Sequence, residues 1–113
     1  MIKRTPGSVA TRSKAVAHNG IVYTVATARK KVPSLYEQAK DALAAIDANL
    51  MEAGTEKSRI LRATVYITSM ADKAEMNRAW DEWVEMANPP QRACIGAVLE
   101  GDDLIEILVT AAV

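Results

Sequence analysis

The C-terminal stretch Leu104-Ile105-Glu106-Ile107-Leu108-Val109-Thr110-Ala111-Ala112-Val113 is apolar except for one carboxylate and one hydroxyl. A run of this kind predicts a strand, and a strand that is apolar on both faces is expected to be covered on both. A carboxylate in such a layer costs several kcal/mol unless it is paired or takes up a proton. Glu106 therefore indicates either an ion pair or a binding site.

Arg92 is the nearest candidate partner, in the strand-like segment Pro90-Gln91-Arg92-Ala93-Cys94-Ile95-Gly96-Ala97. The turn-like Glu100-Gly101-Asp102-Asp103 joins the two segments, so we expect neighbouring strands. Arg92 and Cys94 are two residues apart and should share a face. A guanidinium suits a carboxylate or a phosphate, and a carboxylate in a low-dielectric pocket can exchange protons near neutral pH. Arg92 and Glu106 form either a structural ion pair or the floor of a site for a small anionic substrate, and they could converge across a subunit boundary.

Short signals define the N-terminal half. His18-Asn19-Gly20 separates the apolar runs 14–17 and 21–26 and predicts a hairpin, because Asn-Gly tolerates positive φ. Ser34-Leu35-Tyr36-Glu37 is typical of a capping box that opens a helix, and Gly54 supplies its stop. Residues 1–12 are rich in small and basic residues and are predicted to be irregular.

Alternation over residues 60–67 predicts a strand that buries Leu61, Ala63, Val65 and Ile67. Asp72 and Glu75 predict a second capping box, on a helix that continues to Ala87 and ends at Asn88-Pro89-Pro90. With strands at 92–99 and 104–112, the order is β-β-α-β-α-β-β. This order predicts one α+β domain over residues 1–113, a mixed sheet with both helices on one side. The uncovered face of the sheet then needs another layer, which predicts homo-oligomerisation.

Composition excludes several function classes. Lys plus Arg and Asp plus Glu both number 14, so no net field attracts nucleic acid or an anionic membrane. No apolar run approaches the roughly 18 residues of a membrane span. One cysteine and one histidine cannot form the usual structural zinc site, so no metal is expected. A single cysteine also fits the reducing cytoplasm.

The Arg92-x-Cys94 element, the terminal Ile105-Glu106-Ile107 and the element order together resemble the RidA (YjgF-like) family of reactive-intermediate deaminases, and the helix at 76–84 is similar to short YoaB-like paralogues. The resemblance implies a chorismate-mutase-like fold and a homotrimer whose three sheets form a central barrel, with sites between subunits. It implies hydrolysis of enamine and imine acids, such as 2-aminoacrylate, to 2-keto acids and ammonia, without a cofactor.

The resemblance also implies roles for single residues. Arg92 corresponds to the residue that clamps the substrate carboxylate, and Cys94 to a residue that contributes mainly backbone contacts. Glu106 corresponds to the group that positions or activates the attacking water. Active members carry Ser-Gly-Gln on the second strand, where this chain has Val25 and Ala26 in place of Ser-Gly. Arg12 and Ser13 stand where the family has an aromatic residue. The substrate-binding residues so implied are Arg92, Cys94, Val25, Ala26 and Ser13.

Other readings stay open at this point. The same fold without Ser-Gly could bind a small carboxylate without turning it over. A ribonuclease activity, attributed to some relatives, finds little support in a neutral chain with five aromatic residues. Cys94 as a nucleophile lacks a nearby base, and His18 in its hairpin is expected to be solvated.

Overall fold

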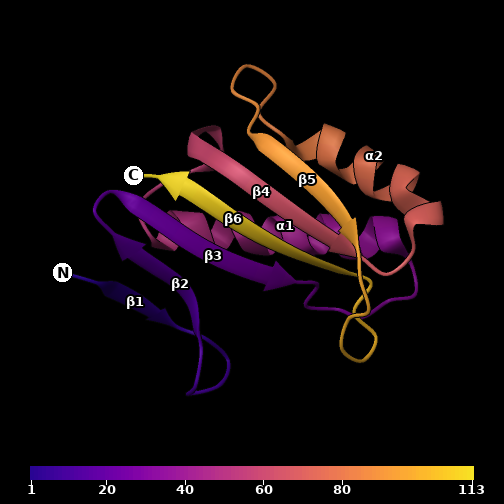
Figure 1. The fold of residues 1–113 in the computed structure, drawn as a ribbon, viewed down its shortest axis with the longest axis horizontal. Helices are drawn as coiled ribbons and strands as arrows, with labels where there is room; N and C mark the ends of the chain where they lie inside the picture. Colours follow the sequence, from indigo (N-terminus) through magenta and orange to yellow (C-terminus); the bar gives the residue numbers. More distant parts are fainter.

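Both helices pack on the same side of a six-stranded sheet and leave its other side open (Figure 1). A computed structural model describes all residues 1–113. The elements are β1 (Lys3–Pro6), β2 (Ser13–His18), β3 (Ile21–Thr27), α1 (Leu35–Glu52), β4 (Ile60–Ile67), α2 (Lys73–Trp83), β5 (Gln91–Gly96) and β6 (Ile105–Ala112). The sheet order is β1-β2-β3-β6-β4-β5, antiparallel throughout except for the parallel pair β4 and β5. The predicted α+β architecture is confirmed, with one strand more than expected.

The additional strand is β1, in the segment predicted to be irregular. It pairs with β2 at the edge of the sheet, where Lys3 lies opposite Ala17. Most of β1 is exposed, so it carries no alternation that a sequence pattern could reveal. Lys3, Arg4 and Pro6 on this edge discourage pairing with a further strand.

The last two strands are not neighbours, which corrects the expectation from the turn-like segment between them. β6 lies between β3 and β4, and β5 lies outside β4 (Figure 1). This order places the most apolar strand in the middle of the sheet, where both of its edges are hydrogen-bonded. It leaves β5, which carries Arg92 and Cys94, as the second edge strand.

The hairpin and the first helix form as predicted. Asn19 and Gly20 have φ values of 51° and 78°, as the tight turn between β2 and β3 requires. Ser34 caps α1 through its Oγ, which accepts a hydrogen bond from the Glu37 N–H at 3.2 Å. Gly54 ends that segment with φ 87°. Neither helix is both long and apolar enough to cross a bilayer.

The second helix differs from its prediction at both ends. Asp72 precedes α2 but its side chain makes no capping hydrogen bond, so the predicted capping box is wrong. The Glu75 carboxylate instead accepts a hydrogen bond from the backbone N–H of Tyr36, at the start of α1. The helix ends at Trp83 rather than at Ala87, because the next residue is extended.

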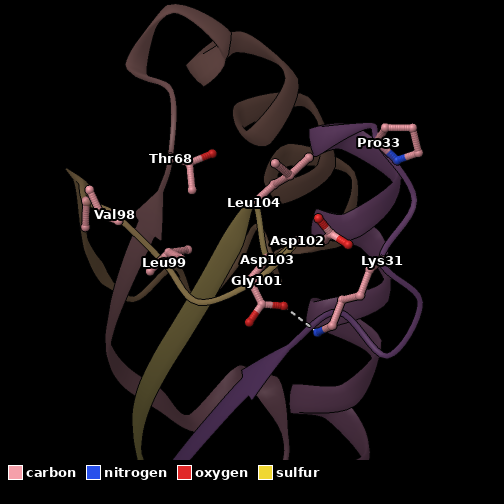
Figure 2. Close-up of a pocket in the computed structure, with 10 residues that line it drawn as sticks. Lys31, Pro33, Thr68, Val98, Leu99, Gly101, Asp102, Asp103 and Leu104 are labelled. Atoms are coloured by element: carbon pink, nitrogen blue, oxygen red, sulfur yellow. Dashed lines mark ion pairs between the residues drawn. The ribbon is translucent and has the colours of Figure 1, made fainter.

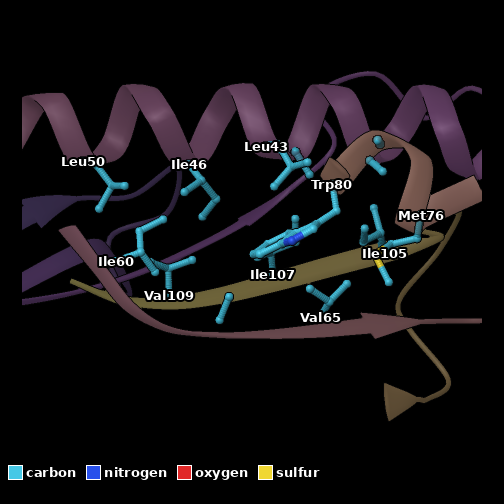
Figure 3. Packing of buried hydrophobic residues seen from close by; sticks show 14 of the residues in the cluster. Leu43, Ile46, Leu50, Ile60, Val65, Met76, Trp80, Ile105, Ile107 and Val109 are labelled. Atoms are coloured by element: carbon cyan, nitrogen blue, oxygen red, sulfur yellow. The ribbon is translucent and has the colours of Figure 1, made fainter. Parts of the chain in front are cut away.

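The core fills the layer between the helices and the sheet (Figure 3). Its buried side chains come mainly from α1, α2, β4 and β6, and they include Leu43, Ile46, Leu50, Val65, Met76, Ile105 and Ile107. Each side chain of this size contributes about 1.5–3 kcal/mol on burial. This layer fixes β6, and with it the position of the residues that point the other way.

Strand β4 contains an irregularity that sequence alternation did not predict. Leu61, expected in the core, is 51% exposed, whereas Ile60 is buried. The register against β6 shifts between Ile60 and Arg62, so a bulge turns Leu61 away from the helices. From Ala63 onward the predicted buried face is correct.

Candidate functional site

Glu106 lies on the face of the sheet opposite to the helices. It pairs with Thr27 of β3 and with Tyr66 of β4, while its neighbours Ile105 and Ile107 are buried under the helices. The carboxylate is half-buried, and none of the ion pairs of the chain includes it. Such a group is available to hydrogen-bond a ligand.

A cavity of about 400 Å³ opens beside Glu106. It is lined by the β1–β2 loop, by the ends of β2, β3 and β6, and by the β5–β6 loop. Four of the predicted site residues meet there, namely Ser13, Val25, Ala26 and Glu106. Its remaining lining residues are Gly7, Ser8, Val9, Arg12, Lys14, Thr27, Glu100 and Asp103. We refer to it as the Glu106 cavity.

A chain of buried polar groups fixes the wall formed by β2 and β3. The Asn49 amide of α1 donates to Thr24 Oγ1 at 3.0 Å and to the Val25 carbonyl at 3.3 Å. Thr24 Oγ1 in turn donates to the Lys14 carbonyl at 2.7 Å. Because each of these groups is paired inside the protein, the backbone at Val25 and Lys14 is held to the helix layer.

A second buried side chain, Gln38 of α1, fixes the β5–β6 loop. Its amide nitrogen donates to the carbonyls of Val32 and Asp102, at 2.8 and 3.0 Å. Its amide oxygen accepts from the Leu104 N–H at 3.0 Å. Gln38 is fully buried, so losing these partners would leave backbone groups unsatisfied. This side chain therefore holds the loop that forms one wall of the cavity.

The β5–β6 loop also lines a larger cavity, of about 790 Å³ (Figure 2). This cavity contains none of the predicted site residues. Its charged groups include Lys31 and Asp103, which form an ion pair with each other. Asp103 lines both cavities, so the β5–β6 loop that carries it forms a wall shared by the two.

Asp41 of α1 fixes the loop that carries Lys31. Burial raises the pKa of Asp41, but the hydrogen bonds from the Lys30 N–H at 2.8 Å and from the Arg29 side chain at 3.1 Å outweigh it. The pKa of this carboxyl consequently lies below its ordinary value. The β3–α1 loop is thus held at one end by Asp41 and at the other by the ion pair of Lys31.

Two cationic groups that reach toward the Glu106 cavity or its wall are already engaged. Lys14 pairs with Glu52 at 3.0 Å, and Lys31 pairs with Asp103. The charged lining groups without an ion pair are those of Arg12, Glu100 and Glu106. The cavity therefore presents one free guanidinium and two free carboxylates.

Arg92 and Cys94 lie outside this cavity, on the helix side of the sheet. Arg92 is opposite Ala63 of the core face, its guanidinium lies 5.3 Å from the Trp80 ring centroid, and Nη1 contacts Met76 Sδ at 3.7 Å. Cys94 is half-buried against the core. Neither makes an ion pair within the chain.

Arg92 and Glu106 therefore do not meet within one chain. They occupy opposite faces of the sheet, and β4 separates their strands. The expectation of neighbouring strands is wrong here, and so is the alternative of a structural ion pair between these two side chains in a single chain. A site that uses both residues needs a second copy of the protein.

Some residues that shape the site were outside the sequence predictions. Gln38 and Asn49 carry no motif, since their role depends on contacts with strands and loops distant in the chain. Glu100 was predicted only as part of a turn. The one available signal was that Gln38 and Asn49 are polar amides on the otherwise apolar, buried side of α1. No group of three or more His, Cys, Asp or Glu side chains is placed to hold a metal ion.

Comparison with known proteins decides the family. The model of the family described as endoribonuclease L-PSP matches residues 2–113. The chain belongs to this family. A RutC family protein from Haemophilus ducreyi is 47% identical over 105 residues, which cover 89% of this chain and 88% of the relative. The RutC family protein YoaB from Escherichia coli is 37% identical over 102 residues, covering 89% and 90% of the two chains.

Solved structures of the family agree with the fold. A crystal structure of a YjgF family member from Neisseria meningitidis matches with a TM-score of 0.94 at 35% identity, covering 99% of this chain and 94% of that one. The predicted resemblance to the RidA (YjgF-like) family, and to its YoaB-like members, is confirmed. The chorismate-mutase-like fold expected of the family is the fold of this chain.

Proposed function

We propose that this protein hydrolyses reactive 2-imino and 2-enamino acids, of the 2-aminoacrylate type, to 2-keto acids and ammonia. The observation that carries the proposal is the Glu106 cavity in a member of this family. A carboxylate without a partner lines a space of about 400 Å³ together with Ser13, Val25 and Ala26. That volume is ample for a three- or four-carbon acid and a water molecule.

Glu106 suits the hydrolytic step. A water held by this carboxylate adds its oxygen to the imine carbon, and its proton passes to Glu106. The nitrogen takes up this proton and then the second proton of the same water, now on the added hydroxyl. The carbon–nitrogen bond then breaks, the nitrogen leaves as ammonia, and the carbon with its new oxygen becomes the carbonyl of a 2-keto acid. The reaction consumes one water and transfers no electrons, so the proposal needs no redox group.

A second copy of the chain supplies Arg92 in this proposal. The open face of the sheet carries apolar side chains that one chain leaves uncovered, with Tyr23 53%, Ile95 44% and Leu108 41% exposed. In the proposed homotrimer these faces pack together and are buried, and the edge strand β5 of one copy lies beside the cavity of another. Arg92 then clamps the substrate carboxylate, and Cys94 contributes backbone contacts. The free thiol of Cys94 fits a cytoplasmic protein.

One observation favours a second candidate, a non-catalytic binder of small carboxylates. Val25 lines the cavity at a place where active relatives carry a hydroxyl, and Ala26 follows it in place of glycine. These side chains narrow the space and remove a polar contact. Binding of a keto acid without turnover of any imine supports this candidate.

A coupled assay tests the proposal. A pyridoxal-phosphate dehydratase or an amino-acid oxidase generates imines from several amino acids in turn, and release of the keto acid is followed with and without this protein. We expect acceleration by the native chain, and a loss of about 10²–10⁴-fold in Glu106→Gln. Glu56→Gln, an exposed carboxylate outside the cavity, is the matched control and should keep full activity.

Two outcomes overturn the proposal. The first is the absence of acceleration for every imine by a folded protein that still binds keto acids. The second is an acceleration that survives in Glu106→Gln. An RNA-cleaving activity that copurifies with the native chain and is absent from Glu106→Gln would instead favour the endoribonuclease description of the family.

A further inference from the structure

The geometry points to Arg12 as a carboxylate-binding residue of the Glu106 cavity, so that the chain which supplies Glu106 also supplies a cation for the substrate. The inference deepens the proposed function and rests on it for the identity of the substrate. Its binding part is independent of turnover. The ligand class is a small 2-imino acid or the corresponding 2-keto acid.

The position of Arg12 carries the first step. It immediately precedes β2 and lines the same cavity as Glu106, Val25 and Ser13. None of the ion pairs of the chain includes its guanidinium. Arg12 is the one arginine among the lining residues, and the neighbouring Lys14 is neutralised by Glu52. A carboxylate that enters the cavity therefore finds its free cation at Arg12.

The β1–β2 loop holds the backbone of Arg12 in place. The Gly7 N–H donates to the Arg12 carbonyl at 3.1 Å, and the Arg12 N–H donates to the Val9 carbonyl at 3.3 Å. A Cβ at Gly7 would lie 2.7 Å from that same Arg12 carbonyl oxygen, so only glycine permits this approach. A residue on a loop closed in this way gives up less backbone freedom when it binds a ligand.

The distribution of charge indicates what the cavity accepts. Arg12 comes from the β1–β2 loop, whereas the free carboxylates Glu100 and Glu106 come from the β5–β6 loop and from β6. A 2-imino acid with a protonated nitrogen carries a negative carboxylate and a positive iminium on adjacent carbons. Its two opposite charges match a cavity whose lining includes one free guanidinium and two free carboxylates, which the charges of a dianion or a dication do not.

Arg12 and Arg92 do not compete in this arrangement. A carboxylate has two oxygens and about four lone-pair sites, so it can accept from two guanidinium groups. Within one chain Arg92 lies outside the cavity, so the proposed function takes it from a second copy, whereas Arg12 lines the cavity of each single chain. Arg12 thus gives the cavity an affinity for carboxylates that does not depend on Arg92.

The experiment uses NMR titration to measure the binding of pyruvate to the native full chain and to Arg12→Ala. Because a charged hydrogen bond at an exposed position is lost, we expect the dissociation constant to rise about tenfold. Arg12→Lys should show an intermediate value, since lysine keeps the charge and loses the planar fork. Arg4→Ala is the matched control, an exposed arginine of the same hairpin that lies outside the cavity, and it should bind as the native chain does.

Pyruvamide, the neutral analogue of pyruvate, separates carboxylate binding from a structural role. We expect it to bind the native chain and Arg12→Ala equally. Unchanged pyruvate affinity in Arg12→Ala, or an equal loss for pyruvate and pyruvamide, overturns the inference.

Turnover of the alanine-derived imine tells the two proposals apart. A higher KM with a nearly unchanged kcat in Arg12→Ala supports both. If the native chain hydrolyses no imine but Arg12→Ala still weakens pyruvate binding, the inference stands and the proposed function fails. If Glu106→Gln abolishes turnover while Arg12→Ala keeps the native KM and pyruvate affinity, the proposed function stands and the inference fails.

Discussion

The two faces of β6 show how one strand serves packing and chemistry at once. Toward the helices it presents Ile105, Ile107 and Val109, each at most 3% exposed. Toward the open side it presents Glu106 and Leu108, and Leu108 is 41% exposed. The strand period of two keeps these sets apart.

Polar groups follow the same division. Under the helices, the buried side-chain amides of Gln38 and Asn49 find their hydrogen-bond partners within the chain. On the open side, Glu106 has none. The difference teaches that the covered face supplies the rigidity, and the open face supplies the unsatisfied groups that a ligand or a second copy can satisfy.

The largest expected effect is a difference in stability between substitutions at two adjacent residues of β6. Ile107→Ala leaves a cavity in the core and should lower the free energy of unfolding by about 3–4 kcal/mol, measured by urea denaturation. Leu108→Ala, the next residue on the open face, should cost less than about 1 kcal/mol in the same measurement at a concentration where the chain is a single copy. Equal losses in the two variants would remove the distinction between the faces.

The next effect tests the buried amides. Gln38→Ala leaves the Leu104 N–H and two carbonyls without partners, so we expect a loss of about 2–3 kcal/mol. Hydrogen exchange at Leu104 should accelerate with it. Gln91→Ala, an exposed glutamine of β5, should change stability by less than about 0.5 kcal/mol. A Gln38 variant as stable as the native chain would contradict the role given to this side chain.

The open face can be tested by its association. Leu108→Asp places a charge on the surface that we propose to be covered, and it should weaken assembly at least about tenfold, measured as molar mass by light scattering. Met51→Asp introduces the same charge at a residue of α1 that is 74% exposed and should leave the molar mass unchanged. A native chain that stays single at micromolar concentration would refute the oligomer itself.

The smallest effect comes from Asp41. Its pKa lies below the ordinary value, so the ionised carboxylate stabilises the fold above about pH 4 and this contribution is lost as the pH falls through the folded-state pKa. Asp41→Asn should therefore cost about 1 kcal/mol at pH 7 and progressively less in acid. Denaturation midpoints of both proteins between pH 7 and pH 3 should converge. A constant difference would assign the effect to packing.

Local signals in the sequence were sufficient for much of the fold. Asn19-Gly20 and the Ser34 cap act within four residues, so their geometry depends little on the rest of the chain. Signals that other elements can override were less reliable. Glu75 could cap its own helix, but its carboxylate contacts the start of α1 instead. The bulge at Leu61 arises from the pairing of β4 with β6, which no pattern within β4 encodes.

The candidate site follows the same rule. Glu106, Val25, Ala26 and Ser13 were predicted from the sequence and the resemblance, and the fold brings them to one cavity. The relation of Arg92 to Glu106 could not be predicted, because it depends on β6 entering the sheet between β3 and β4. The strands of Arg92 and Glu106 follow one another in the chain, but β4 lies between them in the sheet. The two side chains also point to opposite faces of the sheet.

The edge strand β1 has a consequence for colloidal behaviour. With Lys3, Arg4 and Pro6 along it, this border of the sheet resists the addition of a strand from another molecule. The opposite border, β5, has no such protection apart from one arginine. Runaway growth of an extended β-fibril would need two receptive borders on every molecule, and this protein offers one. The exposed edge of β5 can therefore contact another copy of the chain without leading to open-ended growth of a sheet.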